Sequence, residues 1–220
     1  MMGEANDAPE HNREKMIALL LTIKADTVSE ELMLYHASQT PRIETLEPRI
    51  SNHGVPRVYF SAKRENTLVY LSNAVEKTCR ECGFLHTGKW QKWASYGFTK
   101  DGRLEFDEYY ENALIDTYGG VSGYVYAVEP SDAVMPFSDI RNAYYADVPV
   151  PVASCEFVPD ALDAMQIAER EGKIVIVRYA ELSEKMREWL HRTTLDEYRD
   201  AAPDYRFFLE QKFPYVLEKR

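Results

Sequence analysis

The feature that most restricts the fold of this chain is a set of short apolar segments with the composition of β-strands, spaced unevenly along 220 residues. They occur at 32–36, 58–60, 124–128, 153–158 and 173–179, and they are rich in β-branched and aromatic residues. Helical periodicity lies between some of these segments but does not alternate with them regularly. The pattern therefore predicts an α+β fold rather than a doubly wound parallel sheet.

Local signals predict several helices between and after these strands. Ser61 can cap a helix that follows the strand at 58–60, because a serine oxygen accepts hydrogen bonds from the free amides of a first turn. Asp160 can cap a second helix, and Gly172 would end it. A third helix is predicted at 104–114.

We expect one core domain at 15–180, preceded by an acidic, polar and disordered tail at 1–14. The segment at 84–122 is rich in aromatic residues and broken by glycines, which favours an insertion near the core. That insertion would be either a lid over a pocket or a hydrophobic cluster beneath a long loop. Helical periodicity at 181–220 predicts a helical C-terminal extension packed on the core, with a capping signal for a further helix at Thr194.

The composition argues against several classes of protein. A formal net charge of −10 repels phosphate backbones, so we expect no general nucleic-acid binding. The longest apolar run, at 16–21, is too short to cross a bilayer, and the first residues lack the pattern of a secretory signal. Three cysteines are too few for a disulfide scaffold, which favours a reducing, cytoplasmic location. The oligomeric state stays open.

Several common catalytic signatures are absent from the sequence. It contains no G-x-x-x-x-G-K-[ST] phosphate loop and no G-x-G-x-x-G dinucleotide fingerprint. It also lacks the H-E-x-x-H pattern of zinc proteases and the G-x-S-x-G pattern of serine hydrolases. These absences argue against the usual nucleotide folds and against a serine hydrolase.

Three short motifs remain: LYHAS at 34–38, VYFSA at 58–62 and GYVYAVEP at 123–130. Together they resemble ADP-ribosyltransferases of the His-Tyr-acid class, and bacterial rifamycin ADP-ribosyltransferases in particular. That family carries Y-H-G-T, Y-F-[ST]-A and a later strand ending in V-E-P, in the same order. The resemblance implies a split β-sheet core with flanking helices, and it does not extend to the residues after 173.

By this resemblance, His36 and Tyr59 are two of the three catalytic residues. The third is an acid, and we favour Glu156 on the strand at 153–158; Asp132, just past the V-E-P segment, is also open, and Glu129 is a further option. The residues implied to bind the nucleotide belong to the first two motifs: Tyr35, His36, Ala37, Ser38, Tyr59 and Ser61.

The implied substrate is NAD, whose nicotinamide is a good leaving group on an anomeric carbon. His36 would hydrogen-bond a ribose hydroxyl or the phosphate region, and Tyr59 would stack on the nicotinamide ring. The carboxylate would hold the ribose 2′-hydroxyl, stabilise the oxocarbenium-like transition state and take the proton of the acceptor. Ala37 stands where the family has a glycine whose backbone receives the nicotinamide amide. No metal is expected, and the acceptor is an unknown protein or small molecule.

Two other functions are compatible with the same residues. The chain could be a catalytically inactive relative that keeps the fold and binds NAD or another ligand, and the replacement of glycine by Ala37 favours this. It could instead be a zinc-stabilised interaction protein, because Cys79, Cys82 and His86 supply three possible ligands, with Cys155 or His53 as a fourth. A single C-x-x-C pair more often packs as small apolar residues.

Overall fold

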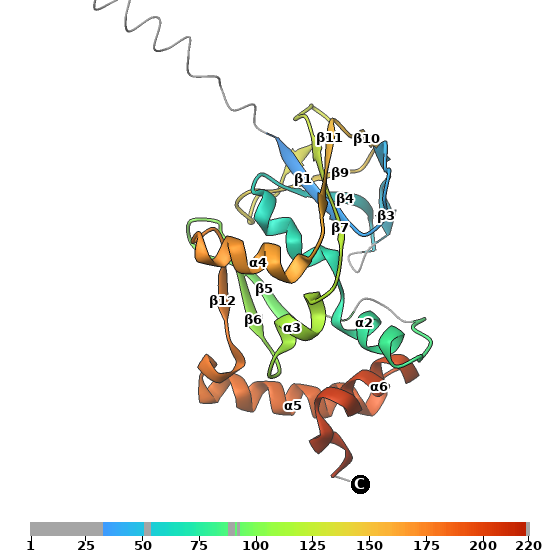
Figure 1. Ribbon diagram of the computed structural model, residues 1–220, viewed down its shortest axis with the longest axis vertical. Coiled ribbons are helices and arrows are strands. Elements are labelled where there is room, and N and C mark those ends of the chain that lie inside the picture. Colours follow the sequence, from blue (N-terminus) through green and yellow to red (C-terminus); the bar gives the residue numbers. More distant parts are fainter. Residues whose placement is uncertain (1–32, 51–53, 88–90, 92, 219–220) are drawn as a thin grey trace, which may run out of the picture. The chain divides into compact units, whose positions relative to one another are not determined.

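The computed structural model describes residues 33–50, 54–87, 91 and 93–218 of the chain (Figure 1). Their strands and helices do not alternate, and most strand pairs are antiparallel, so the predicted α+β class is confirmed. The tail predicted at 1–14, the start of the predicted core at 15–32 and the possible zinc ligand His53 lie outside the described residues.

Within the described chain, the largest sheet has the strand order β11-β7-β1-β4-β9-β8, with β3 paired to β4 outside this path. Every pair in it is antiparallel. Its strands are β1 (Leu34–Ser38), β3 (Arg49–Ile50), β4 (Pro56–Ser61), β7 (Gly123–Val128), β8 (Met135–Pro136), β9 (Ala143–Ala146) and β11 (Ser154–Val158). The three sequence motifs therefore begin on three neighbouring strands, β7, β1 and β4.

The other described strands form two smaller sheets. In one, β6 (Leu104–Glu108) pairs antiparallel with β5 (Ala94–Phe98) and parallel with β12 (Val175–Val177). In the other, β2 (Thr45–Leu46) pairs with β10 (Val150–Pro151). The segment at 173–179, which has the composition of a longer strand, contributes only the three residues of β12.

The helices of the described chain include short 3-10 segments, labelled η. They are η1 (Arg64–Leu71), α2 (Ala74–Glu81), α3 (Ala113–Tyr118), α4 (Ala161–Arg170), η2 (Tyr179–Glu181), α5 (Glu184–Asp200), α6 (Pro203–Lys212) and η3 (Pro214–Leu217). Figure 1 shows α4 between the main sheet and the sheet formed by β5, β6 and β12. One hydrophobic cluster joins these layers, because it contains Val125 of β7, Leu68 of η1, Met165 of α4 and Phe106 of β6.

The glycine of the third motif is explained by this packing. A Cβ atom added at Gly123 would lie 2.6 Å from Cδ2 of Leu71 and 3.1 Å from the carbonyl oxygen of Ser38. Gln39 also donates from Nε2 to the Leu71 carbonyl at 2.5 Å, so the ends of β1 and η1 are held together. Glycine at this position allows η1 to lie directly against β1 and β7.

The helix predicted at 104–114 is wrong. Residues Leu104, Phe106 and Glu108 are buried while Glu105 and Asp107 are half-buried, and this period of two belongs to a strand, β6. The helix begins only at Ala113, after Asn112 has adopted a left-handed backbone with φ 64°. The spacing of apolar residues at 104–114 resembles that of a helix because this segment contains the strand β6 and the start of the helix α3.

Two predicted helix caps are also wrong, and one is confirmed. Ser61 ends β4 instead of capping a helix, and its Oγ accepts from the Lys63 amide; Asn73 caps α2. Thr194 lies inside α5, where its hydroxyl donates to the Leu190 carbonyl at 2.7 Å. Asp160 does cap α4, and its side chain accepts from the Asp163 amide.

The aromatic-rich segment and the C-terminal helices share a second hydrophobic cluster. Trp93, which is 4% exposed, packs in it with Tyr110 and with α6 and η3 residues. The helical residues of this cluster include Cys79 of α2 and Phe208 of α6. The aromatic residues of 84–122 that belong to this cluster are therefore packed against the C-terminal helices.

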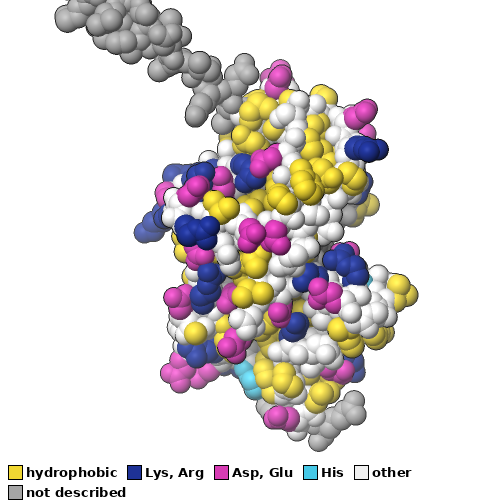
Figure 2. All heavy atoms as spheres, viewed as in Figure 1, with side chains coloured by type: hydrophobic (Ala, Val, Ile, Leu, Met, Phe, Trp, Pro, Cys, Tyr) yellow, Lys and Arg dark blue, Asp and Glu magenta, His cyan; other side chains and the backbone are white. Residues whose placement is uncertain are grey.

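The surface carries both signs of charge. Figure 2 shows acidic and basic side chains interspersed over the face in view, with apolar groups gathered near the upper strands. Among the described residues, no helix has both the length and the apolar character needed to span a membrane.

Candidate functional site

His36 lies in the middle of β1, within the three-strand unit that carries the motifs. It is paired across β7 with Tyr126, so its side chain lies on the same face of the sheet as that of Tyr126. The imidazole contacts the ring of Phe60 edge-on, with ring centroids 6.2 Å apart. His36 is thus a half-buried residue of the central strand, with its ring largely surrounded by protein.

One hydrogen bond determines the state of the His36 ring. Nδ1 lies 2.9 Å from the backbone carbonyl oxygen of Tyr59 on β4. A carbonyl can only accept, so Nδ1 carries a proton, and burial lowers the pKa of the imidazole below its usual value. The ring is therefore neutral near pH 7, and Nε2 presents a lone pair, with no partner for Nε2 among the residues that the structure describes.

The Tyr59 carbonyl is available to His36 because β1 and β4 separate. Their register contains one pair, Tyr35 with Ser61, whereas β1 and β7 are paired over five residues. We call the unpaired stretch that follows the Tyr35–Ser61 pair the β1–β4 split. The His36 side chain spans the split, because its Nδ1 donates to the Tyr59 carbonyl. In a continuous strand ladder, that carbonyl would face a backbone amide of β1.

The backbone of Ala37 faces this split. The Ala127 carbonyl accepts from the Ala153 amide, so the backbone groups of Ala127 point toward β11 and those of the preceding residue, Tyr126, point toward β1. His36, the partner of Tyr126, consequently directs its backbone groups to β7, and Ala37 directs its own to β4. The Ala37 methyl lies on a sheet face and is buried in the first hydrophobic cluster, so it does not enter the split.

The Tyr59 side chain lies on the other face of the sheet from the His36 imidazole. Ser61 is paired with Tyr35, so side chains at 59, 61, 35 and 37 share one face and those of His36 and Phe60 share the opposite one. The Tyr59 ring is half-buried and stacks on Phe137, with centroids 6.1 Å apart and planes inclined by 11°. The two predicted residues therefore meet through the backbone of Tyr59 and the side chain of His36, at the β1–β4 split.

Tyr70 is a residue that the sequence motifs did not single out. It lies at the end of η1, and its side chain is 52% exposed. Burial raises the pKa of Tyr70, and the electrostatic influence of the Tyr59 phenol raises it further. Its spacing of eleven residues from Tyr59, one strand end and one helix later, is the signal that could have found it.

The three candidate acids are placed differently. Glu156 lies on β11, on the sheet face of Tyr59, but it forms a two-point ion pair with Arg64 of η1 at 2.7 and 2.6 Å. This hydrogen bond raises the pKa of Arg64. Asp132 and Glu129 are exposed and follow β7. The structure does not bring any of these carboxylates into contact with the His36 ring.

The remaining predicted binding residues make local contacts. The hydroxyls of Ser38 and Ser61 each accept from an amide two residues later, at 3.1 Å, in Thr40 and Lys63 respectively. Tyr35 packs against the first hydrophobic cluster. Of the predicted set, only His36, Ala37 and Tyr59 direct a group into or beside the β1–β4 split.

The possible zinc ligands that the structure describes do not come together. Cys79 is buried and directs Sγ to the Asp204 carbonyl at 3.5 Å, while Cys82 and Cys155 are exposed. His86 lies near the Asp204 carboxylate, with 4.0 Å between Nε2 and Oδ2. Within the described ranges, no three histidine, cysteine or acidic side chains form a group that could hold a metal.

Two surface pockets among the described residues are lined mainly by C-terminal residues, with Tyr109 in one and Thr87 and Gln91 in the other, and neither includes His36, Tyr59 or the candidate acids. The functional interpretation of the β1–β4 split therefore depends on its hydrogen bonds and registers. Comparison of the chain with protein-family models, with curated proteins and with solved structures found no match.

Proposed function

We propose that this chain binds NAD at the β1–β4 split and cleaves the bond between nicotinamide and ribose, as an ADP-ribosyltransferase or an NAD glycohydrolase. The observation that carries the proposal is the hydrogen bond from His36 Nδ1 to the Tyr59 carbonyl. It holds a neutral imidazole with Nε2 as an acceptor, beside backbone groups of Ala37 that the strand ladder leaves facing the split.

These groups match what NAD offers. A ribose hydroxyl donates to a lone pair such as that of His36 Nε2, and the nicotinamide carboxamide pairs with one backbone N–H and one C=O. Tyr59 and Tyr70 supply aromatic rings for the nicotinamide on the sheet face opposite the His36 imidazole, so an NAD molecule in contact with both must pass through the sheet at the split. The order of the three motifs on adjacent strands supports the resemblance to the ADP-ribosyltransferase-like fold.

The reaction requires one bond to break and one to form. Nicotinamide leaves with the electron pair of its bond to C1′ of the ribose, and a nucleophile bonds to C1′ and loses a proton. Water as nucleophile gives hydrolysis, and an acceptor hydroxyl, amine or guanidine gives transfer. Glu156 could stabilise the cationic ribose and take the proton only after exchanging its contact with Arg64, because both its oxygens bond to that guanidinium.

The ion pair of Arg64 and Glu156 favours a second candidate function, an NAD-binding module without catalysis. In that case Glu156 holds η1 to β11 and has no role toward ribose. Glutamine at position 156 separates these alternatives. If Glu156 is catalytic, E156Q should lower nicotinamide release at least about a hundredfold while NAD binding is kept; D132N serves as the parallel variant for Asp132.

The direct test is to incubate the full chain with NAD, measure free nicotinamide by chromatography and measure NAD binding by calorimetry. In H36N the amide nitrogen can still donate to the Tyr59 carbonyl, but the Nε2 acceptor is lost. We expect NAD affinity to fall about tenfold. R199Q, at an exposed arginine of α5 outside both the split and the described pockets, is the control and should bind NAD like the wild type.

Three outcomes separate the candidates. Binding with nicotinamide release supports the enzyme. Binding without release supports the module. Failure of the wild-type chain to bind NAD, or equal affinity in the wild type and H36N, would overturn both.

A further inference from the structure

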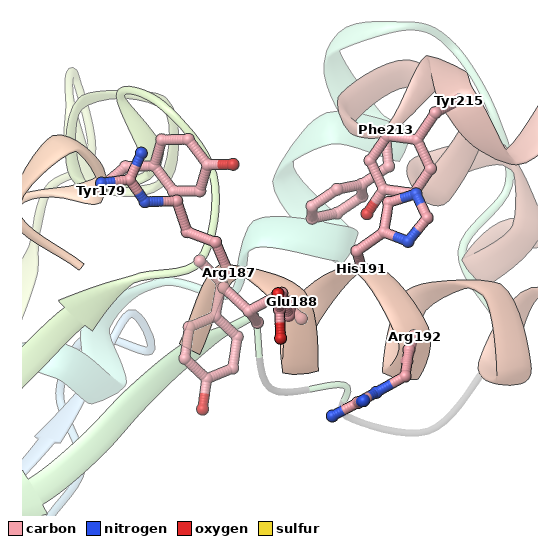
Figure 3. A pocket seen from close by; sticks show the side chains of 9 residues that line it. Tyr179, Arg187, Glu188, His191, Arg192, Phe213 and Tyr215 are labelled. Atoms are coloured by element: carbon pink, nitrogen blue, oxygen red, sulfur yellow. The ribbon is translucent and has the colours of Figure 1, made fainter. Parts of the chain in front are cut away.

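The larger of the two described pockets lies at the C-terminal end of the molecule, on α5. Its volume is about 700 Å³, which is within the range of roughly 300–1,000 Å³ typical of small-molecule sites. Figure 3 shows Tyr179 and Arg187 on one side of it and His191, Phe213 and Tyr215 on the other. Residues from η2 to η3 form most of its walls together with Tyr109, which follows β6, and none of its lining residues belongs to the β1–β4 split.

The walls of this pocket are largely aromatic. Tyr109, Tyr179, Phe213 and Tyr215 line it, and the His191 ring stacks on Tyr215 with centroids 4.5 Å apart. Flat rings on several sides suit a flat, apolar ligand body, because offset and edge-on ring contacts add to the burial of apolar area.

The charged groups of the pocket favour an anion. Two arginines, Arg187 and Arg192, line it against one acid, Glu188. This local excess of positive charge stands out in a chain whose formal net charge is −10. His191 adds a further donor in its neutral form and a positive charge when protonated.

Arg187 is held in place before any ligand arrives. Its Nε and one terminal nitrogen donate to the Leu182 carbonyl at 3.0 and 2.9 Å, and that same terminal nitrogen lies 3.2 Å from the Ala180 carbonyl. A guanidinium fixed in this way keeps its charge beside the pocket without losing further side-chain freedom on binding. Arg192 is exposed on the same helix.

We propose that this pocket binds a small aromatic anion, with the ring between the tyrosines and the negative group near Arg187 and Arg192. The chemical class is an aromatic carboxylate, which presents a planar body and a planar, two-oxygen acceptor for a guanidinium. Neutral aromatic molecules lack the second feature, and aromatic cations are repelled by the two arginines.

The probe is 2-naphthoate, titrated into the full chain and followed by calorimetry and by its own fluorescence. We expect saturable binding at one site, and an affinity about tenfold lower in R192Q, which removes one charge-assisted contact. Y215L should weaken binding by several-fold through loss of a ring contact. The cationic analogue 2-naphthylmethylammonium should bind much more weakly than the anion.

The control is R199Q, which removes an arginine from the same helix outside the pocket, where it pairs with Asp196. It should bind 2-naphthoate like the wild type, and so should H36N. The proposal is overturned by absence of saturable binding, by equal affinity in R192Q and R199Q, or by equal affinity for the anion and the cation. None of these results depends on whether the chain binds NAD.

Discussion

Around His36 the molecule is organised by strand registers and a directed hydrogen bond, whereas around Trp93 it is organised by contacts between rings. Within the described part of the chain, the His36 ring contacts the ring of Phe60 and bonds to one backbone carbonyl. Trp93 packs against four rings at centroid distances between 4.8 and 6.3 Å: Tyr109, Tyr205, Phe208 and Phe213. In the region around His36, polar groups face the β1–β4 split. In the region around Trp93, apolar surface is buried.

This difference separates the residues that recognise a ligand from those that stabilise the fold. Directed hydrogen bonds specify position and protonation but contribute little net stability, since water competes for the same groups in the unfolded chain. Buried rings contribute stability in proportion to the area removed from water and specify no chemistry. We therefore expect substitutions at Trp93 to change the free energy of unfolding, and substitutions at the β1–β4 split to change binding.

The largest expected effect is at Trp93. Trp93→Ala removes a side chain that is 4% exposed and should lower the free energy of unfolding by about 3–5 kcal/mol. Chemical denaturation followed by circular dichroism measures it, with Trp93→Phe as a milder variant if the alanine form does not fold. Trp189→Ala is the control, because Trp189 is 41% exposed. Equal losses in the two alanine variants would contradict the assignment of Trp93 to the stabilising region.

A smaller effect should come from the protonation of His36. Burial lowers its pKa in the folded chain, so below about pH 6.5 the unfolded chain binds a proton that the folded chain does not. This contribution to stability is complete above that pH and is lost as the pH falls toward the lower folded pKa. The slope cannot exceed about 1.4 kcal/mol per pH unit.

The measurement is urea denaturation of the wild type and H36N at pH 7.5 and pH 5.5. Carboxylates contribute equally to both proteins, so the difference in their pH dependence isolates the imidazole. H36N should lose less stability on acidification than the wild type. Identical pH dependence would mean that the His36 ring is as well hydrated in the folded chain as in the unfolded one.

The smallest expected effect is at Tyr70, near the end of η1. Tyr70→Leu should weaken NAD binding by about three- to tenfold, because a ring contact of this kind contributes about 0.5–1.5 kcal/mol. Calorimetry measures the change, and Tyr215→Leu in the C-terminal pocket is the control that should leave NAD affinity unchanged. Stability should change little, since the side chain is 52% exposed. A large loss of stability with unchanged binding would place Tyr70 with the packing residues.

Part of this structure follows from local sequence. The strands at 124–128 and 153–158 are found as β7 and β11, and the helix capped by Asp160 is found as α4, because alternation, β-branching and capping act over a few residues. Where a strand and a helix follow each other closely in the sequence, as β6 and α3 do, the same local patterns predict a single helix and miss the strand. The His36 and Tyr59 motifs are likewise visible in the sequence, but the sheet face of each side chain depends on the strand register.

Local sequence patterns predict the mixed α+β character, five of the twelve described strands and the presence of a histidine and a tyrosine on two of these strands. Contacts between distant segments set the rest: β1 and β4 separate after one pair, His36 bonds to the carbonyl of Tyr59, and Arg64 holds Glu156 across 92 residues of chain. These features are contacts between distant segments, whose energies depend on register and relative position. Propensities describe one segment at a time, so they carry no information about which strands become neighbours or where a ladder stops.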